Sequence, residues 1–352
     1  MTRRNGFRLV AMRGVLSLWL SVVLTGTATV PAAFAAGSGP ALVDLALQLA
    51  PPASVIRLVE GSAALSTGKD GRLTFLLLGM DAYGLTDAIS VMSINPKTGK
   101  MAAASFPRDT GQVRLPNGKV HKGRINSLVK KFTAQYGSRT RALDEFRKVI
   151  AFTMGVEIDH VAMLRFSSFL AMMDDIGPIK VKTIPAKDPW SWDGDPQGVY
   201  FPPATDYELM AYAEPCRGWW KSEPNTGQPG YECHDVFVYA RTRKGKGNSD
   251  FKRQARHVDI VYAAVRQKRD YGAARIAALV AKAQSQSDFY SSLPITVGNA
   301  TELYALLKKG HLAAQNRVVF APTKYSTRLS GGAYRLKLAA VRAWVKTYFK
   351  TI

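Results

Sequence analysis

Acidic and arginine side chains stand at the ends of short apolar runs in the first third of the chain. Asp81 comes just after the apolar run Phe75–Leu78, Asp87 precedes a second run, and Arg108 follows a third. Carboxylates bind divalent cations, and a guanidinium group pairs with phosphate oxygens through charge-assisted hydrogen bonds. These residue types are therefore suited to binding a metal-bound pyrophosphate.

The apolar runs predict three consecutive strands. Ala88–Ile94 and Met101–Phe106 flank a turn that contains Asn, Pro and Gly. Asp87 and Arg108 therefore bracket a predicted hairpin. The run before Asp81 is short and bounded by glycine, as is typical of a buried strand. We expect the three polar side chains to converge at one edge of a sheet.

A second polar cluster lies further along the chain. An extended segment would place Arg241 and Arg243 on one face, because alternate residues of a strand point the same way. Asp250, Arg253 and His257 are spaced three and four apart, which places them on one stripe of a predicted helix. The arginine pair and the stripe form a basic patch suited to phosphate. Taken alone, the pattern also fits a solvated helix face that Asp250 caps.

From Leu73 onward, strand patterns alternate with helical patterns, which predicts the α/β class in one domain over residues 73–350. The predicted helices are Arg124–Tyr136, Thr140–Met154, Ser167–Asp175, Asp250–Lys268, Tyr271–Ala283, Ala300–Lys309 and Leu336–Phe349. Further strands are predicted at His160–Arg165, Ile179–Ile184 and Arg317–Phe320, the last as a candidate to join the sheet.

Residues 1–36 have the pattern of an export signal, with a basic start, an apolar stretch at Val15–Leu24 and a small-x-small cleavage pattern. The absence of charge between Arg13 and Asp44 also leaves this stretch long enough to remain in the bilayer as an anchor. Residues 37–72 are then a linker. Both alternatives predict a domain in the extracytoplasmic cell envelope, either secreted or anchored to the membrane.

The formal net charge is +22 at pH 7, so we expect anionic partners. Inside a cell such a charge would suggest nucleic acid, but export opposes that interpretation and no helix-turn-helix signature supports it. The matching anions outside the membrane are lipid head groups at the membrane surface, pyrophosphate-linked lipids and phosphate-rich wall polymers. A basic surface that only aids solubility or adhesion is the alternative.

Cys216 and Cys233 are the only cysteines, and in an oxidising compartment they predict one disulfide. Closing a loop of this length would contribute about 3 kcal/mol. His234 follows Cys233, but a zinc site would lack a fourth ligand. Residues 187–233, rich in Pro and Trp, are therefore predicted to be a disulfide-stapled loop insertion. Its aromatic side chains would stack on sugars, sit at a membrane interface or form a small satellite core.

These pieces, in this order, resemble the LytR-CpsA-Psr family of cell-envelope phosphotransferases from about residue 73 to residue 349. The order and spacing of the matching pieces are specific. The pieces are Leu76–Asp81, Thr86-Asp87, Ser93–Asn95, Ser105–Asp109, Arg124–Asn126, the pair Arg241 and Arg243, and Asp250–Arg256.

The resemblance implies a central mixed β-sheet flanked by helices, and Mg²⁺ as the cofactor. It implies that Asp81 and Asp87 hold the metal and that Asp250 orients the arginines. The residues expected to bind the pyrophosphate of a polyprenyl-linked donor are Arg108, Arg241, Arg243 and Arg253, with Asp250 and His257 in the same pocket.

The resemblance also implies a hydrophobic tunnel for the polyprenyl tail between the sheet and the helices. Each candidate wall residue, judged singly, fits ordinary core as well. The candidates are Ile125, Leu128, Phe132, Phe146, Ile150, Met154, Leu164, Leu170 and Met173.

Three features depart from the family pattern. The stretch between Asp81 and Asp87 is short, and the stapled insertion is atypical. His257 stands where the family usually has glutamine, and histidine titrates near neutral pH. We therefore expect the donor pocket to depend on pH more than in close relatives.

The expected activity is transfer of a polyprenyl-diphosphate-linked anionic glycopolymer to a hydroxyl of peptidoglycan, in cell-wall assembly. Positioning and charge stabilisation by the arginines and the metal would drive this phosphoryl transfer. Asp109 or a metal-side aspartate would accept the proton, although Asp109 equally fits a cap on the turn after Pro107. The alternatives are hydrolysis of a polyprenyl pyrophosphate and non-enzymatic binding of envelope polymer. Motifs of hydrolases, P-loop proteins and dinucleotide-binding proteins are absent.

Overall fold

The structure is a computed structural model. It describes residues 65, 67–188, 199–211, 233–243, 248–267, 275, 278–279, 282, 285, 288–294 and 297–349. All of them belong to one compact unit, residues 58–352. The predicted export signal and most of the linker, residues 1–64, lie outside the described residues.

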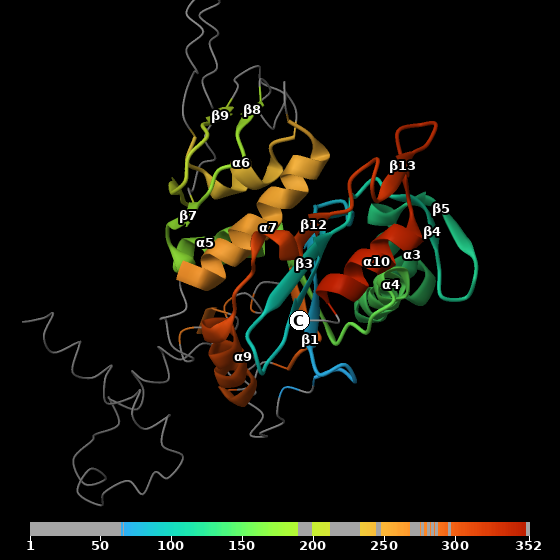
Figure 1. The fold of residues 1–352 in the computed structure, drawn as a ribbon, viewed down its shortest axis with the longest axis horizontal. Helices are drawn as coiled ribbons and strands as arrows, with labels where there is room; N and C mark the ends of the chain where they lie inside the picture. Colours follow the sequence, from blue (N-terminus) through green and yellow to red (C-terminus); the bar gives the residue numbers. More distant parts are fainter. Residues whose placement is uncertain are drawn as a thin grey trace, which may run out of the picture. The chain divides into compact units, whose positions relative to one another are not determined.

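A six-stranded sheet in the order β11-β6-β1-β2-β3-β12 forms the centre of the described structure (Figure 1). Its strands are β1 (Leu73–Met80), β2 (Thr86–Ile94), β3 (Met101–Ser105), β6 (His160–Arg165), β11 (Phe289–Ser291) and β12 (Arg317–Val319). β1 runs antiparallel to β2 and parallel to β6, and β3 runs antiparallel to β2 and parallel to β12. The sheet is therefore mixed, as predicted.

This topology brings chain-distant strand ends to one edge of the sheet. Because β1, β3 and β6 run in the same direction, their carboxyl ends share an edge with the amino end of the antiparallel β2. Arg165 at the end of β6 lies opposite Met80 in the register of β1. Asp81, Asp87 and the residues after Ser105 consequently meet at this edge, as the sequence predicted.

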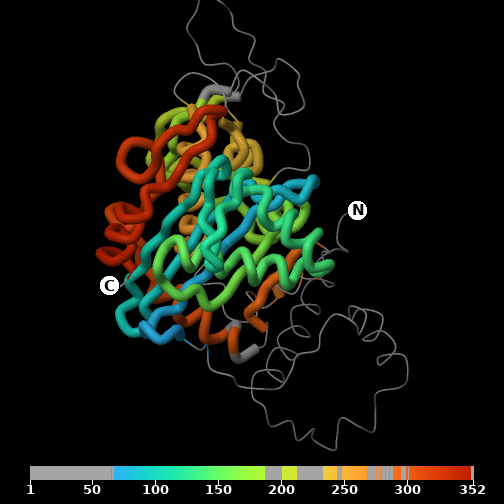
Figure 2. Tube along the Cα trace, turned by 90° about the vertical axis from the view of Figure 1, so that its right-hand side faces the viewer, coloured from blue at the N-terminus to red at the C-terminus, as the bar shows by residue number. Residues whose placement is uncertain are grey.

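Helices cover both faces of the sheet, which agrees with the predicted fold class. Residues of α3 (Leu128–Tyr136), α4 (Arg139–Met154) and α10 (Leu338–Tyr348) share one core cluster with Leu76, Leu78 and Val91 of the sheet. Residues of α7 (Asp250–Gln267) and α9 (Val297–Lys309) pack with Phe75 and Leu77 in another. The alternation of these side chains along β1 shows that each face of the strand is buried. Figure 2 shows the C-terminal segment, in red, running along one side of the blue and teal strands.

A smaller cluster lies beyond the main sheet. It joins α5 (Phe166–Ile176), α6 (Val236–Arg241) and part of α7 to the short strands β7 (Ile179–Val181) and β10 (Tyr207–Leu209). Two further hairpins extend the fold. They are β4 (Gly111–Arg114) with β5 (Val120–Arg124), and β13 (Ser326–Arg328) with β14 (Tyr334–Leu336).

Most predicted elements exist with shifted ends. The helix predicted from Arg124 begins instead with a short 3-10 turn, Ile125–Ser127, because Arg124 belongs to β5. The strand predicted at Ile179–Ile184 ends at Val181. The helix predicted from Leu336 starts at Leu338, because Leu336 pairs with Ser326 in the β13–β14 hairpin. The helix predicted at Tyr271–Ala283 lies mostly outside the described residues.

The predicted insertion is only partly described, and that part is more regular than the sequence suggested. β8 (Ala186–Asp188) pairs with β9 (Val199–Phe201), and β10 pairs with β7. Phe201 and Tyr207 are buried in the smaller cluster, as the satellite-core alternative requires. Cys216 and the insertion's four tryptophans lie outside the described residues. The disulfide between Cys216 and the buried Cys233 is thus not supported by the structure and stays a prediction.

His234 has a structural role here. Its Nδ1 lies 2.8 Å from the carbonyl oxygen of Glu208, and its ring stacks on Tyr207 with centroids 4.4 Å apart.

Within the described part of the chain, no helix is long and apolar enough to cross a membrane.

Candidate diphosphate site

An ion pair across the β2–β3 hairpin forms the centre of the candidate site. Arg108 Nη1 donates to Asp87 Oδ1 over 2.5 Å, and both side chains are 16% exposed. Asp87 lies at the amino end of β2, and Arg108 follows the end of β3, where Phe106 and Pro107 lead the chain off the sheet. Arg108 Nε is buried and has no hydrogen-bond partner among the described residues. This N–H group is therefore left with unused hydrogen-bonding capacity inside the site.

Asp81 shapes the tight turn between β1 and β2. Its Oδ1 accepts from the backbone N–H of Tyr83 at 2.9 Å and of Leu85 at 2.8 Å. Gly84 adopts a φ of 78°, a conformation that glycine enters without steric cost. The short stretch between the two aspartates is thus a turn that Asp81 itself closes. One carboxylate oxygen remains for other ligands.

Helix α7 supplies the opposite wall of the site. Arg253 is 4% exposed and forms an ion pair with Asp250 in the preceding turn. Gln254 Nε2 donates to the backbone carbonyl of Asp87 over 2.9 Å and so ties α7 to the amino end of β2. Arg253 Nε and Asp250 Oδ2 are buried without a hydrogen-bond partner among the described residues. The pair therefore has unused hydrogen-bonding capacity.

Arg241 enters from α6, where the sequence predicted an extended segment. That prediction is wrong, because Asp235 Oδ1 caps a helix by accepting from the backbone N–H groups of Phe237 and Val238. Arg241 is the last residue of this helix, and its guanidinium lies over the ring of Phe166 at 4.4 Å. Arg243 follows two residues later and is exposed. The two arginines therefore do not share a strand face.

Arg256 braces the turn between these two arginines. Its side chain is fully buried and donates to the carbonyl oxygen of Thr242, and to Asn248 Oδ1 over 3.1 Å. Its guanidinium also lies 5.4 Å from the ring of Tyr239. Arg256 thus positions the backbone between Arg241 and Arg243.

The charges of the site act on one another. Burial is the largest influence on Arg241 and lowers its pKa to about 10, while Asp87 and Asp81 oppose this effect. Burial also lowers the pKa of Arg253, against the opposing charges of Asp250 and Asp87. Asp87 therefore lies within electrostatic reach of arginines from both α6 and α7, and Asp81 within reach of Arg241.

Burial and the neighbouring carboxylates act in opposite directions on Arg108. Burial alone would lower the pKa of Arg108, but the carboxylates of Asp87, Asp109 and Asp250 together raise it. Burial raises the pKa of Asp250, in spite of the neighbouring Arg253 and Arg108. Arg108 is thus held firmly in its charged form.

His257 joins the two helices of the site. Its Nε2 lies 2.7 Å from the carbonyl oxygen of Ala240, the residue before Arg241. Burial, and next the charge of Arg253, lower the pKa of His257 to about 3. The expected titration of His257 near neutral pH is therefore contradicted, because the neutral ring is held in place by packing and a backbone bond.

Asp109 lies at the rim of the site. Its Oδ1 accepts from Arg124 Nη1 over 2.9 Å and lies 3.9 Å from Arg108 Nε. Its side chain is 22% exposed. The turn after Pro107 is instead closed by Thr110, whose Oγ1 and backbone N–H both donate to the Pro107 carbonyl oxygen. The alternative of Asp109 as the turn cap is therefore not supported.

The donor set suits a magnesium ion in part. No group of three or more His, Cys, Asp or Glu side chains within the described ranges is close enough to enclose a metal. One carboxylate oxygen of Asp81 accepts hydrogen bonds within its turn, and one carboxylate oxygen of Asp87 accepts from Arg108. Mg²⁺ is commonly bound through one or two carboxylates together with substrate phosphates and water. The two aspartates fit that pattern and hence fit a metal that arrives with a phosphate ligand.

The nine predicted tunnel residues lie in different parts of the fold, and the tunnel stays a prediction. Ile125, Leu128, Phe132, Phe146, Ile150 and Met154 are buried in the core under α3, α4 and α10. Met173 belongs to the smaller cluster, and Leu164 and Leu170 are half-buried. The first six are ordinary core, as the alternative interpretation held.

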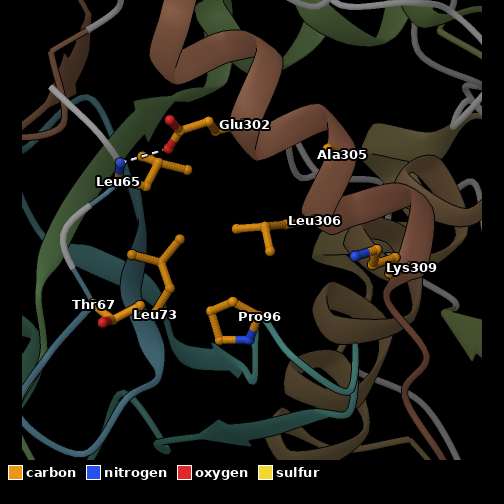
Figure 3. A pocket seen from close by; sticks show the side chains of 8 residues that line it. All are labelled: Leu65, Thr67, Leu73, Pro96, Glu302, Ala305, Leu306 and Lys309. Atoms are coloured by element: carbon orange, nitrogen blue, oxygen red, sulfur yellow. Dashed lines mark hydrogen bonds between the residues drawn. The ribbon is translucent and has the colours of Figure 1, made fainter. Parts of the chain in front are cut away.

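A cavity of about 230 Å³ lies at the opposite edge of the sheet, between α9 and the start of β1 (Figure 3). Leu73, Pro96 and Leu306 line it, and Glu302 accepts from the backbone N–H of Leu65 over 2.6 Å. None of the predicted site residues reaches it. The candidate site is therefore the cluster at the carboxyl ends of β1 and β3.

Some residues of the site were not predicted individually. Gln254 is four positions after Asp250 on the same helix stripe, so helical spacing would have indicated it. Phe166 gave no signal, because nothing in the sequence relates it to Arg241. Arg165 also lies at this edge and pairs with Asp288 over 2.9 Å.

The fold and site define an α/β protein with a cluster of arginines and carboxylates suited to a diphosphate. The model of the LytR_cpsA_psr family matches residues 56–342, and the chain belongs to this family. Members of this cell-envelope family transfer wall teichoic acid glycopolymers to peptidoglycan. A search of curated proteins found no significant sequence match.

Solved structures share the fold. Bacillus subtilis TagV is 20% identical, with a TM-score of 0.52 over 81% of this chain and 100% of TagV. TagT bound to LIIa-WTA is 16% identical, with a TM-score of 0.54 over 83% of this chain and 96% of TagT. A protein from Enterococcus faecalis described as a transcriptional regulator is 16% identical, with a TM-score of 0.56 over 81% of this chain and 90% of that protein.

Proposed function

We propose that this chain transfers an anionic glycopolymer from a polyprenyl diphosphate carrier to a hydroxyl of peptidoglycan. The observation that carries the proposal is the convergence of Asp87, Arg108, Arg241 and Arg253 from four separate elements. Arg241 and Arg253 are buried within electrostatic reach of each other and of Arg243, and a bound anion would compensate this repulsion. Family membership, and the LIIa-WTA bound to TagT, support a lipid-linked glycopolymer as that anion.

The reaction forms one phosphorus–oxygen bond and breaks another. The acceptor hydroxyl oxygen attacks the phosphorus that carries the glycopolymer, and the bond from that phosphorus to the bridging oxygen breaks. Polyprenyl phosphate leaves with the electron pair, and the hydroxyl proton passes to a carboxylate. The product is a phosphodiester between glycopolymer and peptidoglycan, and no covalent enzyme intermediate is needed.

The arginines bind the diphosphate and offset the charge that builds up in the transition state. Arg108 and Arg253 each have a buried Nε without a partner in the described part of the chain, which a phosphate oxygen would satisfy. Arg241 is already oriented by its contact with Phe166. Arg243, exposed at the rim, would bind the outer phosphate.

Asp250 and His257 would act through the arginines. Asp250 orients Arg253 through their ion pair, and His257 holds the end of α6 through the Ala240 carbonyl. Both are positioning residues in this proposal. Neither needs to contact the donor.

Asp109 is the proposed proton acceptor. It is partly exposed at the rim, whereas Asp87 is engaged by Arg108 and Asp81 by its own turn. Arg124 Nη1 orients its carboxylate. A positioned carboxylate of this kind contributes a factor of about 10² to 10⁴ to the rate of a reaction that it serves as base.

Mg²⁺ is the proposed cofactor, with Asp81 and Asp87 as its protein ligands. When bound, it would neutralise negative charge on the diphosphate oxygens. The proposed setting is the outer side of the membrane, with residues 1–36 as export signal or anchor, 37–72 as linker, and the disulfide between Cys216 and Cys233 formed there. The membrane surface would then present the polyprenyl donor.

The test uses the full-length protein with a polyprenyl-diphosphate-linked glycopolymer, with and without peptidoglycan fragments. Mass spectrometry should find a phosphodiester-linked product and an equal amount of polyprenyl phosphate only when the acceptor is present. Equal polyprenyl phosphate release without acceptor would identify a hydrolase instead. Binding without any release would identify a polymer-binding protein.

A further inference from the structure

Two hairpins beside the candidate site carry basic side chains in stretches that contain no acids. The chain has no Asp or Glu from Thr110 to Leu143 and none after Asn316. The first stretch contains the β4–β5 hairpin and the second contains the β13–β14 hairpin. Their positive charges are therefore not compensated within the hairpins themselves.

The two hairpins lie side by side, which brings their basic residues onto one surface. Thr110, just before β4, pairs with Tyr334 of β14, and β14 contacts β4 along its length. Figure 1 shows the red β13 hairpin next to β4 and β5. Arg335 Nη1 donates to Gln112 Oε1 over 3.4 Å, so the charged end of Arg335 lies over β4. Arg114 and Lys122 are exposed, as is Arg335.

A cavity of about 340 Å³ lies between β4 and β14. Its walls are the chain from Thr110 to Arg114, with Arg335, Leu336 and Leu338 on the other side and Thr153 of α4 as well. Gln112 forms a bulge in β4 with a φ of 52°, a left-handed conformation that is rare for residues other than glycine. The bulge turns the side chain of Gln112 toward Arg335. We call this cavity, with Arg114 and Arg335 in its walls, the basic groove.

The basic groove adjoins the candidate site, because Thr110 in its wall directly follows Asp109. The backbone N–H of Tyr334 donates to the carbonyl oxygen of Asp109 over 3.0 Å. Arg124, at the end of β5, reaches Asp109 Oδ1. A glycopolymer whose terminal phosphate is bound at Arg108 would therefore reach the groove just beyond Asp109.

We propose that the basic groove binds the polyanionic chain of the donor, a glycopolymer with phosphate or carboxylate groups along its repeats. This inference rests on the proposed function for the direction of the chain, but binding to the groove can be measured alone. Arg114 and Arg335 line a concave surface, which a single polymer strand can enter. A flat membrane surface would contact protruding parts of the protein instead, so the shape favours a polymer. Guanidinium groups pair with phosphate and carboxylate oxygens, so a neutral glycan would gain little there.

The test is a binding experiment with the full-length protein and a fluorescein-labelled glycerol phosphate oligomer, followed by fluorescence anisotropy. The R114Q/R335Q variant should bind the oligomer about tenfold more weakly, and its affinity should depend less on salt. The matched control is K308Q/K309Q, which removes the same charge from exposed residues of α9 near the opposite sheet edge. The control should bind within about twofold of the wild type. A neutral dextran of equal length should not bind.

Two results would overturn the proposal. One is equal oligomer affinity for R114Q/R335Q and the wild type. The other is loss of binding to phosphatidylglycerol vesicles in R114Q/R335Q with oligomer binding unchanged, which would assign the groove to the membrane surface. Thermal unfolding of both variants checks that they are folded.

The same preparation separates this inference from the proposed function. R108Q should slow glycopolymer transfer about 10²- to 10³-fold and leave oligomer binding unchanged, because the oligomer has no diphosphate. If the wild type transfers no polymer but the groove variants lose oligomer binding as expected, only the proposed function fails. If transfer occurs and the groove variants bind normally, only the groove assignment fails.

Discussion

Asp87 and Arg108 meet at 2.5 Å across the β2–β3 hairpin, although 21 positions separate them in the chain. Gln254 of α7 links this pair to the opposite wall of the site, because its side-chain amide donates to the backbone carbonyl of Asp87. Removing Asp87 would leave Arg108 partly buried near Arg253 with less opposing charge. The contact therefore sets the local charge balance as well as the position of Arg108.

R108Q should lower the rate of glycopolymer transfer about 10²- to 10³-fold, because one guanidinium that stabilises transition-state charge is lost. R108K should recover only part of the activity, since an ammonium group cannot form the paired geometry. The measurement is the initial rate of polyprenyl phosphate release. R139Q, which removes an exposed arginine from the start of α4, is the control and should behave as the wild type. A rate for R108Q within about twofold of the wild type would exclude Arg108 from the site.

D250N should lower both stability and transfer. Arg253 would lose its carboxylate partner although its side chain is only 5% exposed. Breaking such a buried ion pair costs about 3 kcal/mol. The control on the same helix is D259N, which breaks the Asp259–Arg317 pair away from the site. Urea unfolding should show destabilisation in both variants, but only D250N should lose transfer activity among the folded molecules. Equal activity loss in both would mean that Asp250 acts through stability alone.

F166L should weaken donor binding more than it slows turnover. The guanidinium of Arg241 lies 4.4 Å from the Phe166 ring, and this contact holds Arg241 before the donor arrives. Loss of a cation–π contact of this kind costs about 1 kcal/mol, or roughly a fivefold rise in KM. F152L is the matched control, because Phe152 stacks with Arg342 outside the site. A fall in kcat with unchanged KM in F166L would argue against a role in binding.

H257Q should reduce the loss of unfolding free energy that accompanies a fall in pH below about 6.5. The pKa of His257 falls from 6.5 to about 3 on folding, so between these values the unfolded chain binds a proton that the native chain does not. The free energy of unfolding therefore decreases as pH falls from about 6.5 to about 3, by up to about 1.4 kcal/mol per pH unit. Glutamine does not titrate and should remove this part of the slope.

Urea unfolding at a series of pH values provides the measurement for H257Q. Burial also lowers the pKa of His121 and His160, but both remain in the two proteins, so the difference between them isolates His257. Identical slopes for the wild type and H257Q would show that the His257 ring titrates freely in the native state.

The core of the site could be predicted because it depends on strand periodicity. Apolar runs with polar residues at their ends indicated β1, β2 and β3, and antiparallel pairing then required Asp87 and Arg108 to meet. Helical spacing in the same way indicated the stripe of Asp250 and Arg253 on α7. These are local patterns with few competing arrangements.

Other parts depend on contacts that no local pattern records. The segment Val236–Arg241 has strand-like composition, but Asp235 caps it as a helix and buries it against Phe201 and Ile260. His257 is neutral because of the helices around it, which sequence spacing cannot show. The β4–β5 and β13–β14 hairpins were missed although their turns contain Asn117-Gly118 and Gly331-Gly332, which are recognised turn signals.

The most direct test of the account is a crystal structure of the full-length protein with geranyl diphosphate and Mn²⁺ in place of Mg²⁺. We expect the diphosphate among Arg108, Arg241 and Arg253, and an anomalous manganese peak bonded to Asp81 and Asp87. A diphosphate bound elsewhere, or a metal that contacts neither aspartate, would contradict it.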